Sequence, residues 1–263
     1  MNGVAMQGRV ALVAGASKGI GAAAAEAFAA AGAAVVLAAR DTDALNAVAN
    51  RIEANGGKAL AVRTDVSDAG SQRDLIDQTL ATFGRLDAAF NNATDGPHPA
   101  PLADIDPADF DRGIATNIRG TFLGMKYQVP AMLRTGGGTI VNMASRAGLT
   151  GVANLAAYVA GKAGIIGLTR VAALDYADQG IRVNALAPGT ILTHNLEAAG
   201  EQAQRGAAAA TPMGRIGAAT EVADTVLWLC SDQASYITGI IVPIDGGQNA
   251  GVKPPRMMGR ADD

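Results

Sequence analysis

The sequence is poor in cysteine, histidine and aromatic residues. Its single cysteine, Cys230, excludes a disulfide within the chain, and the surrounding stretch LWLCSD indicates that this residue packs on a core. With only two histidines, His98 and His194, the sequence argues against a histidine-based metal site. The net charge of −3 contains no basic excess, so a nucleic-acid-binding surface is not expected. We therefore predict a cytoplasmic protein that needs neither a metal nor a nucleic acid.

Long hydrophobic runs are absent as well. Charged residues such as Lys18, Glu26 and Arg40 interrupt the apolar stretches, and none reaches the roughly 18 residues that a membrane span needs. The N-terminal apolar run is short and has no charged segment before it, so no signal peptide is expected. A chain of 263 residues that is 49% hydrophobic and 17% charged fits one compact domain with a substantial core.

Short apolar runs alternate with helical segments along the chain. The expected strands are rich in Val, Ile, Leu and Ala without polar alternation, which is typical of strands buried on both faces. They span 9–15, 33–39, 58–64, 86–92, 138–144, 181–187 and 239–245. The expected helices span 20–31, 41–54, 69–83, 107–133, 152–178 and 220–230. This alternation predicts an α/β fold, a doubly wound, seven-stranded parallel sheet in a single domain over 1–263, with its core in 8–247.

A glycine-rich turn follows the first expected strand. In AGASKGIG, residues 14–21, Gly15, Gly19 and Gly21 have the spacing G-x-x-x-G-x-G. Glycines here permit a tight turn, a close approach of the backbone to a diphosphate, or close packing of helix on strand. The next helix begins near Ile20, so its free N–H groups point toward an anion. This placement predicts a dinucleotide site.

The loop spacing and several further motifs resemble one known family. The motifs are GASKGIG at 15–21, DV at 65–66, NNA at 91–93, Asn117 in IATNIRG, Ser145 in IVNMAS, YVAGK at 158–162, RVNALAPG at 182–189 and IDGG at 244–247. In this order they make the chain similar to the single-domain branch of the short-chain dehydrogenase/reductase superfamily, from about Gly8 to Gly247. The resemblance implies a Rossmann-type fold and an NAD(P)-dependent alcohol dehydrogenase or carbonyl reductase.

The end of the second expected strand bears on the choice of dinucleotide. NAD-binding folds usually place an acid there for the ribose 2′-hydroxyl, whereas this chain has Ala39 followed by Arg40. A guanidinium pairs with a 2′-phosphate through its planar fork, and Lys18 adds a second positive charge. These residues favour NADP(H) over NAD(H). In the alternative interpretation, Arg40 is solvated and Asp41 is the N-cap of the next helix.

The resemblance also implies the remaining cofactor contacts. It assigns Ser17, Lys18, Gly19 and Ile20 to the phosphate loop, the Asp65 side chain and Val66 backbone to the adenine, Asn91 and Ala93 to the ribose, and Pro188, Gly189, Ile191 and Thr193 to the nicotinamide carboxamide. The alternatives are purely structural. Asp65 would cap a turn, and Pro188-Gly189 would be a turn after a strand.

Tyr158 and Lys162 lie four residues apart in an expected helix, so their side chains share one face. A free phenol has a pKa of about 10 and is a poor base at neutral pH. A nearby ammonium group favours the phenolate, and a dry pocket strengthens that attraction. We therefore expect Lys162 to lower the pKa of Tyr158, which would then exchange a proton with a substrate oxygen.

Two further residues complete the catalytic set that the resemblance implies. Ser145 would hydrogen-bond the substrate carbonyl and stabilise the negative charge that develops there. Asn117 would help to hold a water chain that links Lys162 to solvent, and its amide would equally satisfy a helix bend. In the direction of reduction, hydride would arrive from NADPH and Tyr158 would donate the proton. Lys162 would also bind the nicotinamide ribose.

Three positions depart from the family pattern. Ala14 stands where Thr is common, Thr94 replaces the glycine that usually ends NNAG, and Gly161 replaces a common Ser. Ala14 removes a hydroxyl that would tie the glycine-rich loop to the NNA segment. Bulk at Thr94 is expected to narrow the space near the nicotinamide. None of the three removes a catalytic group.

Three segments, 94–102, 146–154 and 191–213, are expected to determine substrate specificity. The last has helical character and is predicted to act as a lid. Many small apolar residues in these segments favour a neutral, fairly apolar ketone or secondary alcohol. Arg146 and Arg205 are either solvated surface residues or contacts for an anionic substrate.

Assembly and rival functions rest on analogy. Small residues in the long helical segments fit close packing, and the resemblance implies a homotetramer. The C-terminal segment 248–263 is expected to be a mobile tail or an arm packed on a neighbour. The alternative function is a non-catalytic NADP(H)-binding sensor or scaffold, which would not need Ser145, Tyr158 and Lys162. A sugar-nucleotide epimerase is disfavoured because a large C-terminal substrate region is lacking.

Overall fold

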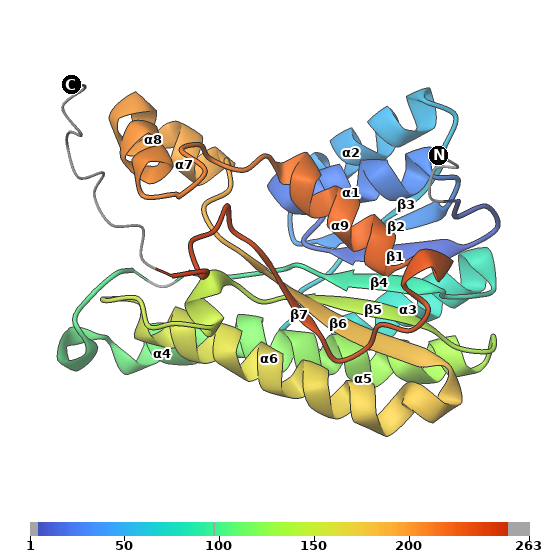
Figure 1. Cartoon of the computed structure of the whole chain (residues 1–263). Coiled ribbons are helices and arrows are strands. Elements are labelled where there is room, and N and C mark those ends of the chain that lie inside the picture. The colour runs from blue at the N-terminus through green and yellow to red at the C-terminus, as the bar shows by residue number, and fades with distance from the viewer. Residues whose placement is uncertain (1–4, 97, 252–263) are drawn as a thin grey trace, which may run out of the picture.

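The computed structural model describes residues 5–96 and 98–251 of the chain. Seven parallel strands form one sheet, as the sequence predicts (Figure 1). Their order in the sheet is β3-β2-β1-β4-β5-β6-β7. The strands are β1 (Val10–Ala14), β2 (Ala34–Ala39), β3 (Lys58–Arg63), β4 (Ala88–Asn91), β5 (Gly138–Met143), β6 (Ile181–Pro188) and β7 (Ile241–Ile244). The α/β, Rossmann-type fold and its single domain are confirmed.

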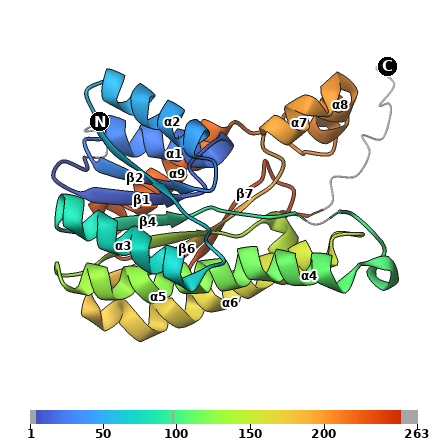
Figure 2. The same cartoon turned by 180° about the vertical axis from the view of Figure 1, so that it is seen from behind.

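Helices cover both faces of the sheet. They are α1 (Gly19–Ala30), α2 (Thr42–Ala54), α3 (Ala69–Phe83), α4 (Pro107–Ile114), α5 (Gly120–Leu133), α6 (Ala156–Tyr176), α7 (His194–Ala198), α8 (Gly200–Ala209) and α9 (Ala219–Leu229). Figures 1 and 2 show α1, α2 and α9 on one face and α3, α5 and α6 on the other. Neighbouring residues of β1 enter opposite halves of the core, Val13 with Phe28 of α1 and Leu12 with Leu75 of α3. This double burial explains why the strands lack polar alternation.

The helices differ from the expectation at three places. The segment 107–133, predicted as one helix, contains a π-helical turn at Ala115–Arg119 between α4 and α5, with Asn117 at its centre. The predicted lid consists of two short helices, α7 and α8, which Figure 1 shows standing apart from the sheet. Helix α6 begins at Ala156, later than expected, because the residues before it form a separate 3₁₀ turn and loop.

The strand order reverses direction between β1 and β4. Ala14 at the end of β1 pairs with Ala38 of β2 on one side and with Asn91 of β4 on the other. The chain therefore leaves these strands in opposite directions, and the loops that follow them separate. Ligands of open α/β sheets bind in the crevice at such a point, outside the carboxyl ends of the strands.

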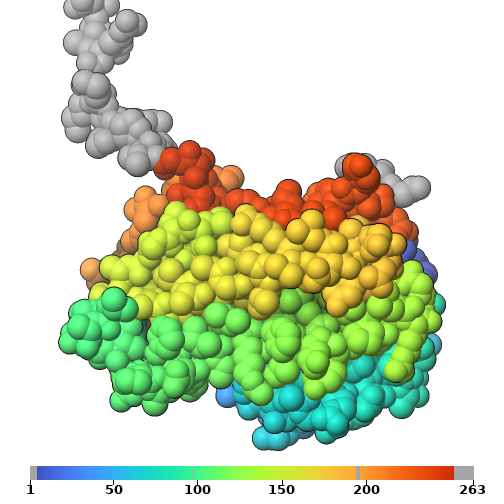
Figure 3. Space-filling model, turned by 90° about the horizontal axis from the view of Figure 1, so that it is seen from below, coloured from blue at the N-terminus to red at the C-terminus, as the bar shows by residue number. Residues whose placement is uncertain are grey.

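The outer face of α5 and α6 is unusually apolar. Val171 is 56% and Leu174 is 82% exposed, and Phe122 of α5 is also exposed. Figure 3 looks onto the face that these two helices form. The stretch Ala156–Gln179 is long and apolar enough to span a membrane by length and composition. Because α6 contacts β6 and α4, we interpret it as a core helix of the domain.

Candidate active-site cleft

A cleft of about 740 Å³ lies at the carboxyl ends of the strands, where the fold predicts a ligand site. The predicted residues that line it are Gly15, Ser17, Lys18, Gly19, Ile20, Arg40, Asp65, Val66, Ala93, Ser145, Tyr158, Lys162, Pro188, Gly189, Ile191 and Thr193. Gly21, Asn91 and Asn117 do not line it. The cleft therefore brings together most of the predicted residues from segments that are far apart in the sequence.

The glycine-rich loop is built for close backbone contact. Gly15 has a φ of +77°, and a Cβ there would lie 2.8 Å from the backbone nitrogen of Ala93. A Cβ on Gly21 would overlap the carbonyl oxygen of Gly15, so this glycine allows α1 to pack on the loop. Helix α1 has no side-chain cap from Lys18 at its N-terminus. Its first N–H groups are therefore free for an anion.

The end of β2 contains both features that the sequence left as alternatives. The Asp41 carboxylate accepts a hydrogen bond from the Ala44 N–H at 3.0 Å, so Asp41 is the N-cap of α2. Arg40 is exposed and lines the cleft together with Lys18. The carboxylate of Asp41 thus caps α2, and the side chains of Lys18 and Arg40 line the cleft.

Asp65 is also held by its own turn. Its carboxylate accepts hydrogen bonds from the Ser67 N–H at 2.9 Å and the Ser67 hydroxyl at 2.7 Å. The Ser67 hydroxyl bond holds the pKa of Asp65 below its ordinary value, and the positive charge of Arg40 contributes. Asp65 therefore caps a turn and lines the cleft at the same time.

The structure does not place Asn91 where the sequence analysis expected it. Its buried amide donates to Gln128 at 3.1 Å and to Asn142 at 2.9 Å, on the side of the sheet away from the cleft loops. Asn92 lines the cleft instead and donates to the Gly15 carbonyl at 3.1 Å. Successive side chains of a strand point to opposite faces, so a shift by one residue exchanges the two roles. Asn92 also supplies a tie to the loop that Ala14 cannot make.

Ser145, Tyr158 and Lys162 meet at the floor of the cleft. Ser145 follows β5, its oxygen accepts from the Ala147 N–H at 3.1 Å, and it lines the cleft together with Tyr158. The Lys162 ammonium nitrogen lies 5.5 Å from the centroid of the Tyr158 ring. It donates to the Met143 carbonyl at 2.9 Å. Helix α6 thus presents both side chains toward the end of β5.

Burial dominates the electrostatics of this group. Lys162 is only 1% exposed, and burial lowers the pKa of its ammonium group to about 7. Burial also raises the pKa of Tyr158 above its ordinary value, against the opposing effect of the Ser145 hydrogen bond. The expectation that Lys162 lowers the pKa of Tyr158 is therefore wrong for the protein alone. A lysine that is itself about half neutral at pH 7 gives its neighbour little charge.

Asn117 lies behind the cleft and is fully buried. Its amide nitrogen donates to the carbonyls of Asp95 at 2.8 Å and Gly113 at 2.9 Å. Its oxygen accepts a hydrogen bond from the Thr94 hydroxyl at 2.8 Å. The amide thus satisfies the backbone around the π-helical turn, as one of the two sequence interpretations proposed.

The loop after β6 forms the opposite wall. Ile191 pairs with Gly217, and the Leu192 N–H donates to the Gly217 carbonyl at 2.8 Å, which closes the base of the α7–α8 hairpin. Gln248 holds the middle of the loop, accepting from the Thr190 N–H at 3.2 Å and donating to its hydroxyl at 3.3 Å. Gln248, at the start of the predicted tail, is thus anchored, and 252–263 lie outside the described residues.

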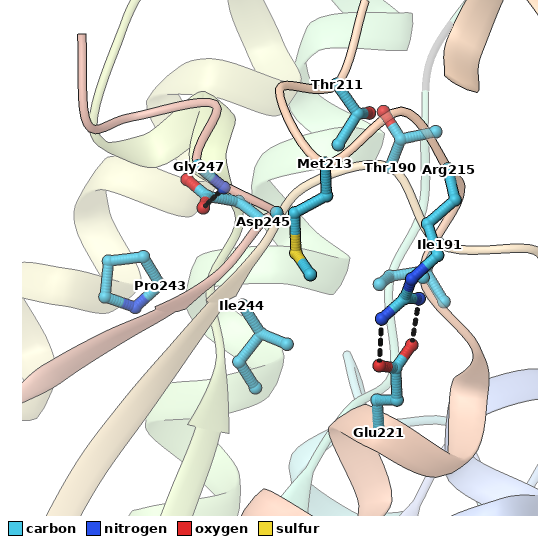
Figure 4. A pocket seen from close by; sticks show the side chains of 12 residues that line it. Thr190, Ile191, Thr211, Met213, Arg215, Glu221, Pro243, Ile244, Asp245 and Gly247 are labelled. Atoms are coloured by element: carbon cyan, nitrogen blue, oxygen red, sulfur yellow. Dashed lines mark hydrogen bonds and ion pairs between the residues drawn. The ribbon is translucent and has the colours of Figure 1, made fainter. Parts of the chain in front are cut away.

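A second cavity of about 360 Å³ lies beside this wall (Figure 4). Thr190 and Ile191 line both cavities. Figure 4 shows Arg215 facing Glu221, and the two form a two-pronged ion pair at 2.8 and 2.7 Å. This pair fixes the chain between the hairpin and α9.

Arg146 and Arg205, which the sequence left as surface residues or as contacts for an anionic substrate, do not line the cleft. Arg205 pairs with Glu201 on the exposed side of α8, and Arg146 donates to Thr150. His98 is exposed away from the cleft. In the part of the chain that the structure describes, no group of His, Cys, Asp and Glu side chains could hold a metal ion.

Sequence reasoning missed several lining residues. They are Asp41, Ala44, Thr64, Asn92, Gly96, Thr116, Met143, Ala144 and Thr190, whereas Ala39 and Thr94 were placed near the cofactor by the sequence. Most follow a strand end or adjoin a predicted residue, so the positions of the strand ends were the available signal. The position of a residue at a strand end therefore predicts that it lines the cleft, independently of its side chain.

Known proteins similar to this chain share its length and fold. The family model described as enoyl-(acyl carrier protein) reductase matches residues 15–249. A 2,5-dichloro-2,5-cyclohexadiene-1,4-diol dehydrogenase of Sphingobium indicum is 42% identical over 249 residues, which cover 93% of this chain and 98% of that protein. A cyclohexanol dehydrogenase of Acinetobacter sp. is 41% identical over 238 residues, covering 90% and 94%.

Solved structures agree. Levodione reductase has a TM-score of 0.90 at 36% identity, covering 94% of this chain and 100% of that one. A 7α-hydroxysteroid dehydrogenase complexed with NADH and 7-oxo glycochenodeoxycholic acid has a TM-score of 0.88 at 35% identity, covering 92% and 95%. The chain therefore belongs to the short-chain dehydrogenase/reductase superfamily, a family of oxidoreductases that use nicotinamide cofactors.

Proposed function

We propose that the protein is an NADP(H)-dependent alcohol dehydrogenase or carbonyl reductase that acts on neutral cyclic secondary alcohols and the corresponding ketones. The observation that carries the proposal is that Ser145, Tyr158 and Lys162 line one cleft, with the buried Lys162 nitrogen 5.5 Å from the centroid of the Tyr158 ring. The Ser145 and Tyr158 hydroxyls would supply a pair of hydrogen bonds for one substrate oxygen.

The residues of the cleft fit a nicotinamide dinucleotide. The free N-terminus of α1 and the close-packed Gly15 would hold the diphosphate. Asp65 and Val66 would hold the adenine, Lys162 the nicotinamide ribose, and the loop at Ile191 and Thr193 the carboxamide. The cofactor supplies or accepts the hydride when bound. The protein positions the reactants and moves the proton.

The proton chemistry falls to Tyr158 and Lys162. In reduction, Tyr158 donates its hydroxyl proton to the substrate oxygen, while Ser145 orients that oxygen and stabilises its developing charge. Lys162 has a pKa of about 7 because it is buried, so it gains and loses a proton readily at neutral pH. This property suits an amine that returns protons to Tyr158.

Six-membered rings are the proposed substrate class. The relatives named above include dehydrogenases of a cyclohexadiene diol and of cyclohexanol. The cleft-lining residues near Ser145 and Tyr158 are mostly small or apolar, among them Ala93, Ala144 and Ile191. We expect turnover of cyclohexanol with NADP⁺ and of cyclohexanone with NADPH, followed by nicotinamide absorbance. Binding of the cofactor without turnover across a panel of cyclic and linear alcohols and ketones would instead indicate a sensor or scaffold.

The preference for NADP(H) rests on Arg40, which follows β2, and on Lys18 of the glycine-rich loop, both of which line the cleft. A charge-assisted bond to a phosphate contributes about 1.5–3 kcal/mol, so Arg40→Asp should weaken NADPH binding by about ten- to a hundredfold. NADH binding should change far less. Arg73→Asp, an exposed residue of α3 outside the cleft, provides the control for the change in charge. Equal losses for the two cofactors in a fluorescence titration would contradict the assignment.

We also propose a homotetramer in the cytoplasm. The exposed apolar residues of α5 and α6, Phe122, Val171 and Leu174, support burial of this face against another subunit. Light scattering should give four times the mass of the chain. A monomer mass would refute this assembly and leave the proposed chemistry untouched.

A further inference from the structure

Thr94 contacts the one predicted catalytic residue that lies outside the cleft. Its hydroxyl donates to the Asn117 side-chain oxygen at 2.8 Å. Thr94 itself follows β4 and lines the cleft together with Ser145 and Tyr158. The same residue thus borders the reaction space on one side and the buried amide on the other. Bulk near the nicotinamide, which the sequence suggested, is therefore not its only effect.

Two backbone carbonyls fix which way the Asn117 amide faces, and the Thr94 hydroxyl satisfies the amide oxygen on the other side. The amide nitrogen donates to two carbonyls, those of Asp95 and Gly113. If the amide were reversed, its oxygen would face these carbonyls and its nitrogen would face the Thr94 hydroxyl. Among the described residues, the Thr94 hydroxyl is the donor to the Asn117 oxygen. Because Asn117 is fully buried, loss of this donor would leave a polar atom without a partner.

Asn117 in turn supports the catalytic turn of α6. A Cβ on Gly161 would lie 2.9 Å from the Asn117 Cβ and 3.5 Å from its amide nitrogen. The helix therefore rests directly on the Asn117 side chain, at the residue next to Lys162 and within one turn of Tyr158. In a close-packed interior, a displaced amide moves what rests on it. A continuous chain of contacts runs from the Thr94 hydroxyl through Asn117 to the Tyr158–Lys162 turn.

The segment that carries Thr94 is held from a second side. The Asp95 carboxylate pairs with Arg112 of α4 at 3.2 Å, and Arg112 also pairs with Asp109. Both of these ion pairs are partly exposed, so they add little to stability. They nevertheless keep the backbone of 94–95 beside the π-helical turn, where the Thr94 hydroxyl reaches Asn117.

We propose that Thr94 is a positioning residue whose hydroxyl locks the Asn117 amide and thereby seats the Tyr158–Lys162 turn of α6. The role in turnover rests on the proposed function. The contrasting role is steric: Thr94 would act only through the volume that it takes from the cleft. The two roles differ in which atom of Thr94 matters, so substitutions can separate them.

Three substitutions of Thr94 form the test. Thr94→Val keeps the shape and removes the hydroxyl, Thr94→Ser keeps the hydroxyl and removes the methyl group, and Thr94→Gly removes both. Thr225→Val, on α9, is the control, because its hydroxyl bonds only the Glu221 carbonyl of its own helix. For each variant we would measure cofactor affinity, kcat and its pH profile with cyclohexanol, and amide hydrogen exchange over 156–162.

Loss of the hydroxyl should change kcat rather than cofactor affinity. Misplacement of Tyr158 and Lys162 should slow proton transfer and lower kcat about tenfold in Thr94→Val, with Thr94→Ser close to wild type. A loosened turn admits water to Lys162, and hydration raises the pKa of a buried lysine. The midpoint of the pH profile of kcat should therefore move to higher pH in Thr94→Val. Amide exchange over 156–162 should become faster in Thr94→Val and Thr94→Gly alone.

Three results would overturn the proposal. The first is a Thr94→Val variant that matches wild type in kcat, pH profile and amide exchange. The second is a Thr94→Ser variant as impaired as Thr94→Val, because this result would assign the effect to the methyl group. A loss in Thr94→Val with an unchanged pH profile and unchanged exchange would make the hydroxyl merely structural. If the wild type turns over no substrate, the proposed function fails, and the exchange experiment still decides whether Thr94 seats the turn.

Discussion

Replacing Lys162 by methionine should change how the stability of the protein depends on pH. The lysine is 1% exposed, and its pKa falls from 10.5 to about 7 because burial disfavours its charged form. Methionine has a similar length and carries no charge, so the substitution removes the titration and keeps most of the packing. It also leaves the Met143 carbonyl without its donor, a cost that does not vary with pH.

The size and sign of the effect follow from proton linkage. Below pH 7 both the folded and the unfolded chain carry the proton, and the folded state bears the full cost of a buried charge. Between pH 7 and 10.5 the unfolded chain binds a proton that the folded chain lacks, so the free energy of unfolding rises with pH. The slope is about 1.4 kcal/mol per pH unit, or about 5 kcal/mol across this window.

Urea unfolding at several pH values measures the effect directly. Between pH 7 and 9, the free energy of unfolding of the wild type should gain about 2 kcal/mol relative to Lys162→Met. Lys126→Met, at an exposed position of α5, should keep the wild-type dependence. Parallel curves for wild type and Lys162→Met would show that Lys162 titrates normally. The proton-relay role that we assign to it would then lose its basis.

Further substitutions test the loop, the nicotinamide wall and the core. Gly21→Ala should abolish cofactor binding because its Cβ would overlap the Gly15 carbonyl oxygen. The control Gly206→Ala, in open space on α8, should be neutral or stabilising. Cofactor binding by Gly21→Ala at wild-type affinity would refute the packing argument. Gln248→Leu should lower kcat severalfold in steady-state assays by releasing Thr190, and unchanged kinetics would contradict this. Cys230→Ala should cost about 1 kcal/mol in urea unfolding without loss of activity, since the thiol is fully buried and burial raises its pKa to about 12; inactivation would refute a structural role.

The fold could be predicted because each strand is buried on both faces. Such strands must be continuous apolar runs, and all seven runs in the sequence correspond to strands of the sheet. The run 86–92 forms β4 at Ala88–Asn91, within the boundary error of this kind of reasoning. The π-helical turn at Ala115–Arg119 was not predicted, because the side-chain bonds of Asn117 at its centre are made to Thr94 and Asp95 of another segment.

The site could be predicted only where local sequence determines it. The spacing of Tyr158 and Lys162 places them on one helix face, and the glycine-rich loop follows its strand directly. The exchange of Asn91 for Asn92 depends on which face of β4 turns inward, which the short strand does not reveal. Burial by residues that are distant in the sequence lowers the pKa of Lys162 and raises the pKa of Tyr158. The spacing of the two residues alone therefore gave the wrong direction for the pKa of Tyr158.

Turnover by Tyr158→Phe tests the central proposal most directly. The substitution removes the hydroxyl of Tyr158 from the cleft and keeps the ring beside Lys162. We predict wild-type folding and NADPH binding, with oxidation of cyclohexanol reduced by at least a hundredfold, the usual contribution of a positioned acid or base. A variant that binds NADPH and oxidises cyclohexanol at the wild-type rate would contradict the assignment of Tyr158 as the proton donor and acceptor.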